Sequence, residues 1–204
     1  MNTNSLQQDH SVEVASPAAE RAQRPQLVGI PLPGVYGVYA LIGGQLTKLD
    51  PLPLRIPDPR VAVSAVISAP SRAHLPAGPL QIVVFRRDLA ANAPDRVSLR
   101  VVAQVKRALS FDATGKPTIA TVEQAWVVRN DSYAMTVAPM PGNPEMIIIR
   151  PDPAARELPA GRYALALRDG GYDFTIDGPN SDAAHCLERT DALEVPVYSE
   201  CRNP

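Results

Sequence analysis

Four aspartates near the C-terminus are the side chains of this sequence whose type and spacing could do chemistry. They are Asp169, Asp173, Asp177 and Asp182. Asp173 and Asp177 are four positions apart, so they would lie on one face of a β-strand. Paired carboxylates can bind calcium, or act as acid and base on a glycan, and Glu188 would join them in a hydrolase. The calcium-loop pattern Asp-x-Asp-x-Asp-Gly is missing, and a solvated strand face, which needs acidic residues in any case, is the favoured explanation.

The chain has two cysteines, Cys186 and Cys201, which are 15 positions apart. In an oxidising compartment such a pair forms a disulfide with Cα atoms about 5 to 6 Å apart, whereas in the cytoplasm both would remain buried thiols. His185 precedes Cys186, but adjacent residues of a strand point apart, which disfavours a catalytic pair. These three residues and His74 lack the close ligand pairs of structural zinc sites. We therefore expect no metal and no cofactor.

Arg86, Arg87, Arg96 and Arg100 form a group of basic residues. They could make a patch for an acidic partner, or simply belong to a solvated strand face. The net charge is −1, so no overall field draws the protein to nucleic acid, and we expect no nucleic-acid partner. The nucleophile-elbow, phosphate-loop, dinucleotide-glycine and His-Glu-x-x-His patterns are missing.

Apolar residues near the C-terminus alternate with a period of two, which predicts a β-hairpin. The segments 163–167 and 172–176 would be its strands, and Asp169-Gly170-Gly171 supplies residues that suit a tight turn. The second strand would turn Asp173 and Asp177 toward solvent. The segment 35–49 has the same layout, with Gly43-Gly44 as its turn, and is a weak candidate for an internal repeat.

The 22 prolines exclude long helices and divide the chain into short pieces. The pattern predicts an all-β protein, namely an antiparallel β-sandwich of about ten short strands. Further strands are expected at 61–67, 80–85, 96–106, 125–129, 133–137, 146–150 and 193–198. We expect turns at Asn130-Asp131 and in the proline-rich segment 139–144. Asp182 is expected to cap a short helical turn through 185–189.

The N-terminal segment 1–26 is polar and has no apolar core of a signal peptide. We interpret it as a disordered arm or spacer, followed by a single β-sandwich domain at 27–204. No window of 18 apolar residues is present, so we expect no transmembrane segment.

The string GRYALALRDGGYDFTIDG, followed by HCLER and a terminal VYSEC, resembles the C-terminal half of a family of exported bacterial β-rich proteins. The similarity covers about the last quarter of the chain. It implies export and a β-rich domain, but it carries over no activity and no catalytic residue. Because no signal peptide is visible, a periplasmic or secreted location and a cytoplasmic one both stay open.

Three functions follow from these patterns. The first is a non-enzymatic exported protein with a binding or structural role at the cell envelope, whose partner is a protein or an envelope component. The alternative is a hydrolase, which requires Asp173, Asp177 and Glu188 to converge in a pocket. The third is a subunit of a larger assembly, which requires an exposed apolar edge or patch. The oligomeric state stays open.

Overall fold

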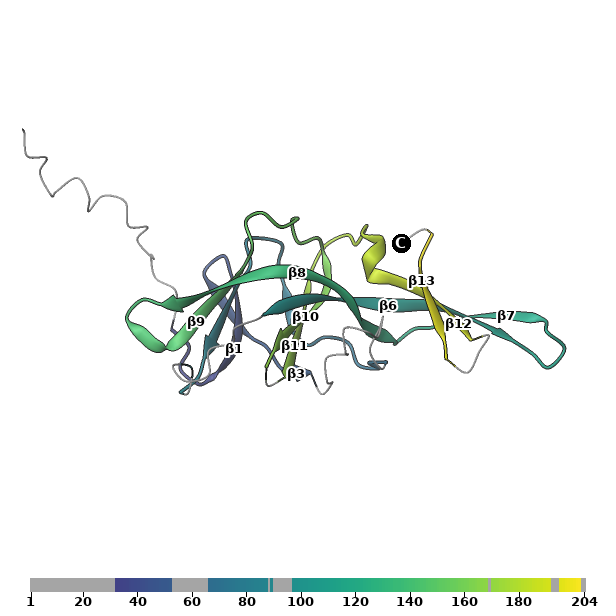
Figure 1. The fold of residues 1–204 in the computed structure, drawn as a ribbon, viewed down its shortest axis with the longest axis horizontal. Helices are drawn as coiled ribbons and strands as arrows, with labels where there is room; N and C mark the ends of the chain where they lie inside the picture. The colour runs from purple at the N-terminus through teal and green to yellow at the C-terminus, as the bar shows by residue number, and fades with distance from the viewer. Residues whose placement is uncertain are drawn as a thin grey trace, which may run out of the picture. The chain divides into compact units, whose positions relative to one another are not determined.

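One 13-stranded, mainly antiparallel β-sheet dominates the computed structural model (Figure 1). The main strand order is β2-β1-β5-β9-β8-β6-β10-β11-β3, and β4, β7, β12 and β13 attach beside this path. Two pairs are parallel, β4 with β11 and β12 with β6. The all-β class is therefore confirmed.

The structure describes residues 32–52, 66–87, 89, 97–168, 170–191 and 195–202. The expected arm at 1–26, most of the expected strand at 61–67, Arg96 and Asp169 lie outside these ranges. Residues 31–204 belong to one unit, and the predicted domain boundary at residue 27 stays a prediction.

Each strand is short except the two central ones, β6 and β8. The bounds are β1 Gly37–Ile42, β2 Gln45–Lys48, β3 Pro51–Leu52, β4 His74–Leu75, β5 Gln81–Phe85, β6 Ser98–Phe111, β7 Pro117–Thr121, β8 Trp126–Met140, β9 Asn143–Pro151, β10 Gly161–Leu167, β11 Gly170–Ile176, β12 Cys186–Asp191 and β13 Val197–Glu200, with a 3₁₀ turn, η2, at Ala183–His185.

The main hydrophobic core is shared by both ends of the sheet. Val38 of β1 and Ile82 of β5 belong to the same buried cluster as Leu99 of β6, Tyr163 of β10 and Phe174 of β11. The sheet must therefore fold over on itself, so that one face encloses this core. The expected division into two sandwich sheets is not confirmed, and thirteen described strands replace the expected ten or so.

Both predicted hairpins form, and both begin with a tyrosine that bonds back to the chain. The Tyr163 hydroxyl donates to the Pro159 carbonyl at 2.7 Å, and the Tyr39 hydroxyl donates to the Val35 carbonyl at 2.9 Å. Each acceptor lies four residues upstream, an arrangement known as a tyrosine corner. The similar layout of the two segments thus reflects the same local structure.

The central strands differ from their predicted bounds. Strand β8 runs through Asn130-Asp131, where we expected a turn, because a register shift against β6 between Arg100 and Val102 absorbs the irregularity as a bulge. Strands β8 and β9 also extend into the expected loop at 139–144, leaving a tight turn in which Gly142 has a φ of 80°. Strand β7 was not predicted.

Candidate functional site

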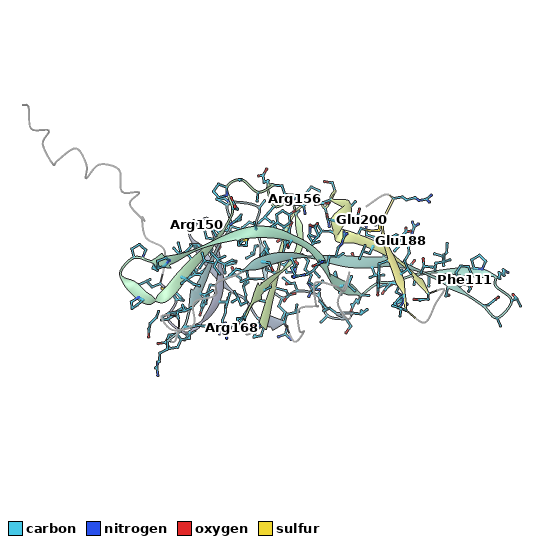
Figure 2. The ribbon with its side chains drawn as sticks, in the orientation of Figure 1. Phe111, Arg150, Arg156, Arg168, Glu188 and Glu200 are labelled. Carbon is cyan, nitrogen blue, oxygen red and sulfur yellow. A yellow bond between two sulfur atoms is a disulfide. The ribbon has the colours of Figure 1, made fainter. Side chains whose placement is uncertain are left out.

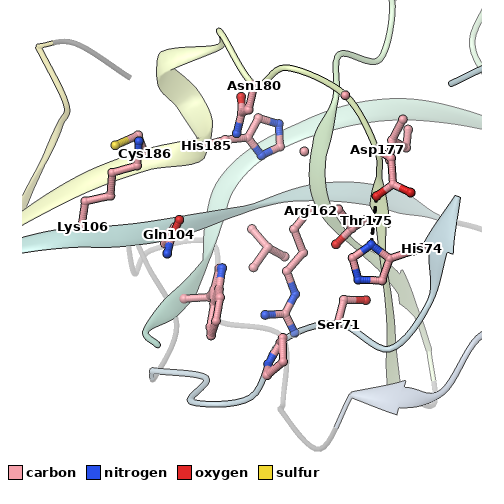
Figure 3. A pocket seen from close by; sticks show the side chains of 16 residues that line it. Ser71, His74, Gln104, Lys106, Arg162, Thr175, Asp177, Asn180, His185 and Cys186 are labelled. Carbon is pink, nitrogen blue, oxygen red and sulfur yellow. Dashed lines mark hydrogen bonds and ion pairs between the residues drawn. The ribbon is translucent and has the colours of Figure 1, made fainter. Parts of the chain in front are cut away.

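A pocket of about 340 Å³ lies on the sheet face opposite the main core (Figure 3). Its floor comes from β6, β8, β10 and β11, which contribute Val102, Trp126, Arg162 and Thr175. The chain segments around residues 70–74 and 178–186 form its walls. Its polar lining includes Ser71, His74, Gln104, Lys106, Thr175, Asp177 and Asn180.

A buried ion pair lies at the floor of the pocket. Arg162 is only 7% exposed and donates through Nε to Asp173 at 2.9 Å and through a second nitrogen to the same carboxylate. Its third nitrogen donates to the Ala69 carbonyl, and its guanidinium lies 5.1 Å from the centre of the Trp126 ring. Our expectation that Asp173 faces solvent was wrong. Arg162, on the neighbouring strand, faces the same side and neutralises it.

A histidine–aspartate hydrogen bond lies at the rim of the pocket. His74 Nδ1 donates to Asp177 Oδ1 at 2.9 Å, and both side chains are more than half exposed. The Ser71 hydroxyl lies in the same wall but donates to the Ala73 carbonyl at 3.4 Å. In the described structure Ser71 therefore makes no bond with His74, and a Ser-His-Asp nucleophile is not assembled.

His185 closes the inner end of the pocket and is only 3% exposed. Its Nε2 lies 3.2 Å from the Tyr163 hydroxyl. Because Tyr163 gives its single proton to Pro159, His185 Nε2 must be the donor, which leaves Nδ1 as a lone-pair acceptor. Nδ1 has no hydrogen-bond partner. A Cβ at Gly161 would lie 2.5 Å from the imidazole, so this position requires glycine.

Burial lowers the pKa of His185 below its ordinary value of 6.5, and the positive charges of Arg129 and Arg156 lower it further. The Val102 backbone and Asp182 oppose this shift only in part. The unfolded chain therefore takes up a proton at this residue at a higher pH than the folded protein does. The contribution of His185 to stability is complete above about pH 6.5 and declines as the pH falls through the folded-state pKa.

We therefore expect the free energy of unfolding of the wild type to fall more steeply than that of His185→Asn between pH 6.5 and 5.5, by at most about 1 kcal/mol. Urea denaturation of both proteins at several pH values measures this difference. Parallel pH profiles for the two proteins would show that His185 does not titrate differently on folding.

The predicted acidic residues do not gather in one place. Asp173 is buried with Arg162, and Asp177 pairs with His74. Asp182 is the N-cap of η2, where its Oδ1 accepts from the Ala184 amide at 2.9 Å. Glu188 lies on β12, lines a different hollow and pairs with Arg107. Asp169 lies outside the described residues.

The predicted basic residues also have separate partners. Arg86 donates to the Tyr172 hydroxyl at 2.8 Å, and Arg87 lies 5.8 Å from the centre of the Tyr36 ring. Arg100, on β6, donates to Asn130 Oδ1 at 3.0 Å. Arg96 lies outside the described residues. The described arginines thus make separate local contacts, Arg86 and Arg87 just after β5 and Arg100 on β6.

The disulfide between Cys186 and Cys201 is confirmed, with Cα atoms 5.4 Å apart. It joins the start of β12 to the residue after β13, and the Cys201 amide also donates to the Cys186 carbonyl at 3.1 Å. The capping role of Asp182 is present, but the turn is Ala183–His185. The expected turn at 185–189 was wrong, because residues from Cys186 onward pair with β6 and β13 as a strand.

No cluster of three or more histidine, cysteine, aspartate or glutamate side chains in the described ranges is placed to hold a metal ion. No helix in those ranges has the length and apolar character needed to cross a membrane.

Sequence reasoning missed Arg162, the central side chain of the pocket floor. The signal was present, because a hairpin that pairs residue 162 with residue 175 brings Arg162 diagonally next to Asp173 on one face. Trp126, on the strand expected at 125–129, packs on this second face against the cluster that contains Ile67 and Val128.

Comparisons of the chain with protein-family models, with curated proteins and with solved structures found no match.

Proposed function

We propose that the protein is exported and binds a component of the bacterial cell envelope in the pocket, without catalysing a reaction on it. The observation that carries this proposal is the buried pair at the floor of the pocket. Arg162 and Asp173 hold each other there, and the Ser71 hydroxyl beside His74 donates to the Ala73 carbonyl instead. A buried carboxylate held by an arginine is suited to fixing the shape of a site, whereas a general acid or base must be able to exchange a proton with a substrate.

The hydrolase alternative is less well supported. It requires Asp173, Asp177 and Glu188 to converge, and they lie in a buried pair, at the rim of the pocket and at a different hollow. Of the two carboxyl groups nearest the pocket, Asp173 is paired with Arg162 and Asp177 accepts a hydrogen bond from His74.

Export is supported by the disulfide, because disulfides persist in the periplasm and outside the cell and are rare in the cytoplasm. We also propose that the folded sheet acts as a sandwich-like scaffold, in which the pocket face is held rigid by the core beneath it.

The ligand should be polar and rich in hydroxyl or amide groups. Gln104, Thr175 and Asn180 offer neutral donors and acceptors, and Lys106 adds a positive charge at one end of the pocket. Peptidoglycan fragments combine these features, since they carry sugar hydroxyls, amides and carboxylates.

Trp126 is the only tryptophan of the chain and lines the pocket, so its fluorescence reports directly on binding. We expect soluble peptidoglycan fragments to change this fluorescence in a saturable way. The double variant Gln104→Ala/Asn180→Ala should weaken binding about tenfold or more, because it removes two hydrogen-bonding side chains.

The matched control is Thr118→Ala, an exposed polar change on β7, which should leave the dissociation constant unchanged. Fluorescence that does not respond to the fragments, or fragments that are hydrolysed during the titration, would contradict the proposal.

A further inference from the structure

The C-terminal half of β6 extends past the residues that pair with β8 and β10, and there it pairs with β7 and β12 instead. Strand β10 pairs with β6 only up to Val102, and β8 pairs with it only up to Gln104. Beyond these points β7 pairs with residues 107–111 on one side, and β12 pairs with residues 104–110 on the other. The result is a four-stranded extension with the order β7-β6-β12-β13 (Figure 1).

One face of this extension carries an apolar row. The register places Ile119 opposite Leu109, Leu109 opposite Thr190, and Thr190 opposite Val197, and directly opposed residues share a face. Ile119 is 69% exposed and Val197 is 55% exposed. Phe111, 45% exposed, lies two positions from Leu109 on the same face, and Figure 2 shows it at the far end of β6.

Strand β7 is an open edge of the described sheet, since it pairs with β6 alone. The Asp112 amide donates to the Lys116 carbonyl, and the Val122 amide donates to the Lys106 carbonyl. Bonding groups alternate along an antiparallel strand, so the even-numbered residues of β7 face β6. The backbone groups of Pro117, Ile119 and Thr121 therefore face outward, where they can bond another strand.

Proteins usually protect such an edge with charges, a proline, a bulge or a short strand. Strand β7 is short and begins with Pro117, but it has no charged residue and no bulge against β6. Its five residues, Pro117–Thr121, are all exposed and all uncharged. Pairing β7 with a copy of itself would therefore bring no like charges together. The edge is also self-complementary, because an antiparallel pairing centred on Ile119 overlaps the whole strand.

We propose that β7 pairs antiparallel with β7 of a second copy of this chain, with Ile119 opposite Ile119 across a two-fold axis. Each Ile119 exchanges both backbone bonds with its counterpart, and each Thr121 amide donates to the Pro117 carbonyl of the other copy. Pro117 has no amide to donate to the Thr121 carbonyl of the other copy, so the backbone bonds across the axis are the two exchanged by the Ile119 residues and the two donated by the Thr121 amides. The apolar row then continues from one copy into the other.

Five paired residues form a small contact compared with the 1,200–2,000 Å² of a typical stable interface. The association should therefore be weak and visible mainly at high protein concentration. Covalent trapping is suited to it, because the native cysteines are already joined to each other.

The test is oxidation of Ile119→Cys at high concentration. Hydrogen-bonded antiparallel partners have Cα atoms about 5.5 Å apart, within disulfide range, so a covalent dimer should form. Thr121→Cys is the matched control on the same edge. Its two copies would lie four positions apart along the strands, about 13 Å, and it should stay monomeric.

Sedimentation adds a test without cysteine. Ile119→Lys should lower self-association, whereas Val137→Lys, an exposed change on β8, should not. The proposal is overturned if Ile119→Cys stays monomeric, if Thr121→Cys or Val197→Cys is trapped equally well, or if Ile119→Cys is trapped only by a different protein from a host extract.

Discussion

Replacing Asp173 by alanine is expected to lower the free energy of unfolding by about 3–5 kcal/mol. The change leaves the Arg162 guanidinium, which is 7% exposed, without its carboxylate on the floor of the pocket. A buried charge that has lost its partner keeps the cost of desolvation without the attraction that offset it. Urea denaturation of the wild type and the variant measures the difference.

Asp131→Ala is the matched control, because its carboxylate pairs with Arg156 on a partly exposed surface. This change should cost no more than about 1 kcal/mol. The double variant Arg162→Met/Asp173→Leu should be more stable than Asp173→Ala, since it removes the whole ion pair and leaves no charge unpaired. A loss in Asp173→Ala no larger than that in Asp131→Ala would show that the pair is not buried in solution.

Cys201→Ser is expected to destabilise the protein by about 2–4 kcal/mol, because the bridge closes a 15-residue separation in the unfolded chain. The loss of stability should be greatest in β13. Strand β13 pairs only with β12, and without the bridge nothing covalent holds its end. Hydrogen exchange should therefore accelerate in Val197–Glu200 before it accelerates in β10.

The reduced wild type is the control for this variant, and it should show the same stability and the same exchange pattern. Equal stability of the oxidised wild type, the reduced wild type and Cys201→Ser would mean that the bridge does not constrain the chain.

The features that the sequence predicts well are those determined by neighbouring residues. The β10–β11 hairpin follows from the alternating apolar residues of its two strands, although Gly170 and Gly171, which we expected in the turn, pair with Leu167 and Ala166 as the start of β11. The cap of η2 follows from Asp182. The disulfide is also local, because only 15 positions separate its cysteines. Local chemistry of this kind needs no knowledge of the rest of the fold.

The features that the sequence does not predict depend on which residues are buried or left exposed by segments that are distant in the sequence. Strand β7 is exposed throughout, so it carries no alternating apolar pattern to reveal it. Asp173 looks like a solvent-facing residue until the chain around Ala69 and Trp126 closes over Arg162. The pocket arises for the same reason, since its two walls are about a hundred positions apart in the sequence.

The most direct test of an exported, disulfide-stabilised protein is to determine where it resides in its host and the state of its cysteines there. Cells are treated with an alkylating reagent before lysis and fractionated, and the peptides that contain Cys186 and Cys201 are identified by mass spectrometry. We predict the disulfide-linked pair in the periplasmic or extracellular fraction. Recovery of the protein from the cytoplasm with both cysteines alkylated would contradict the account.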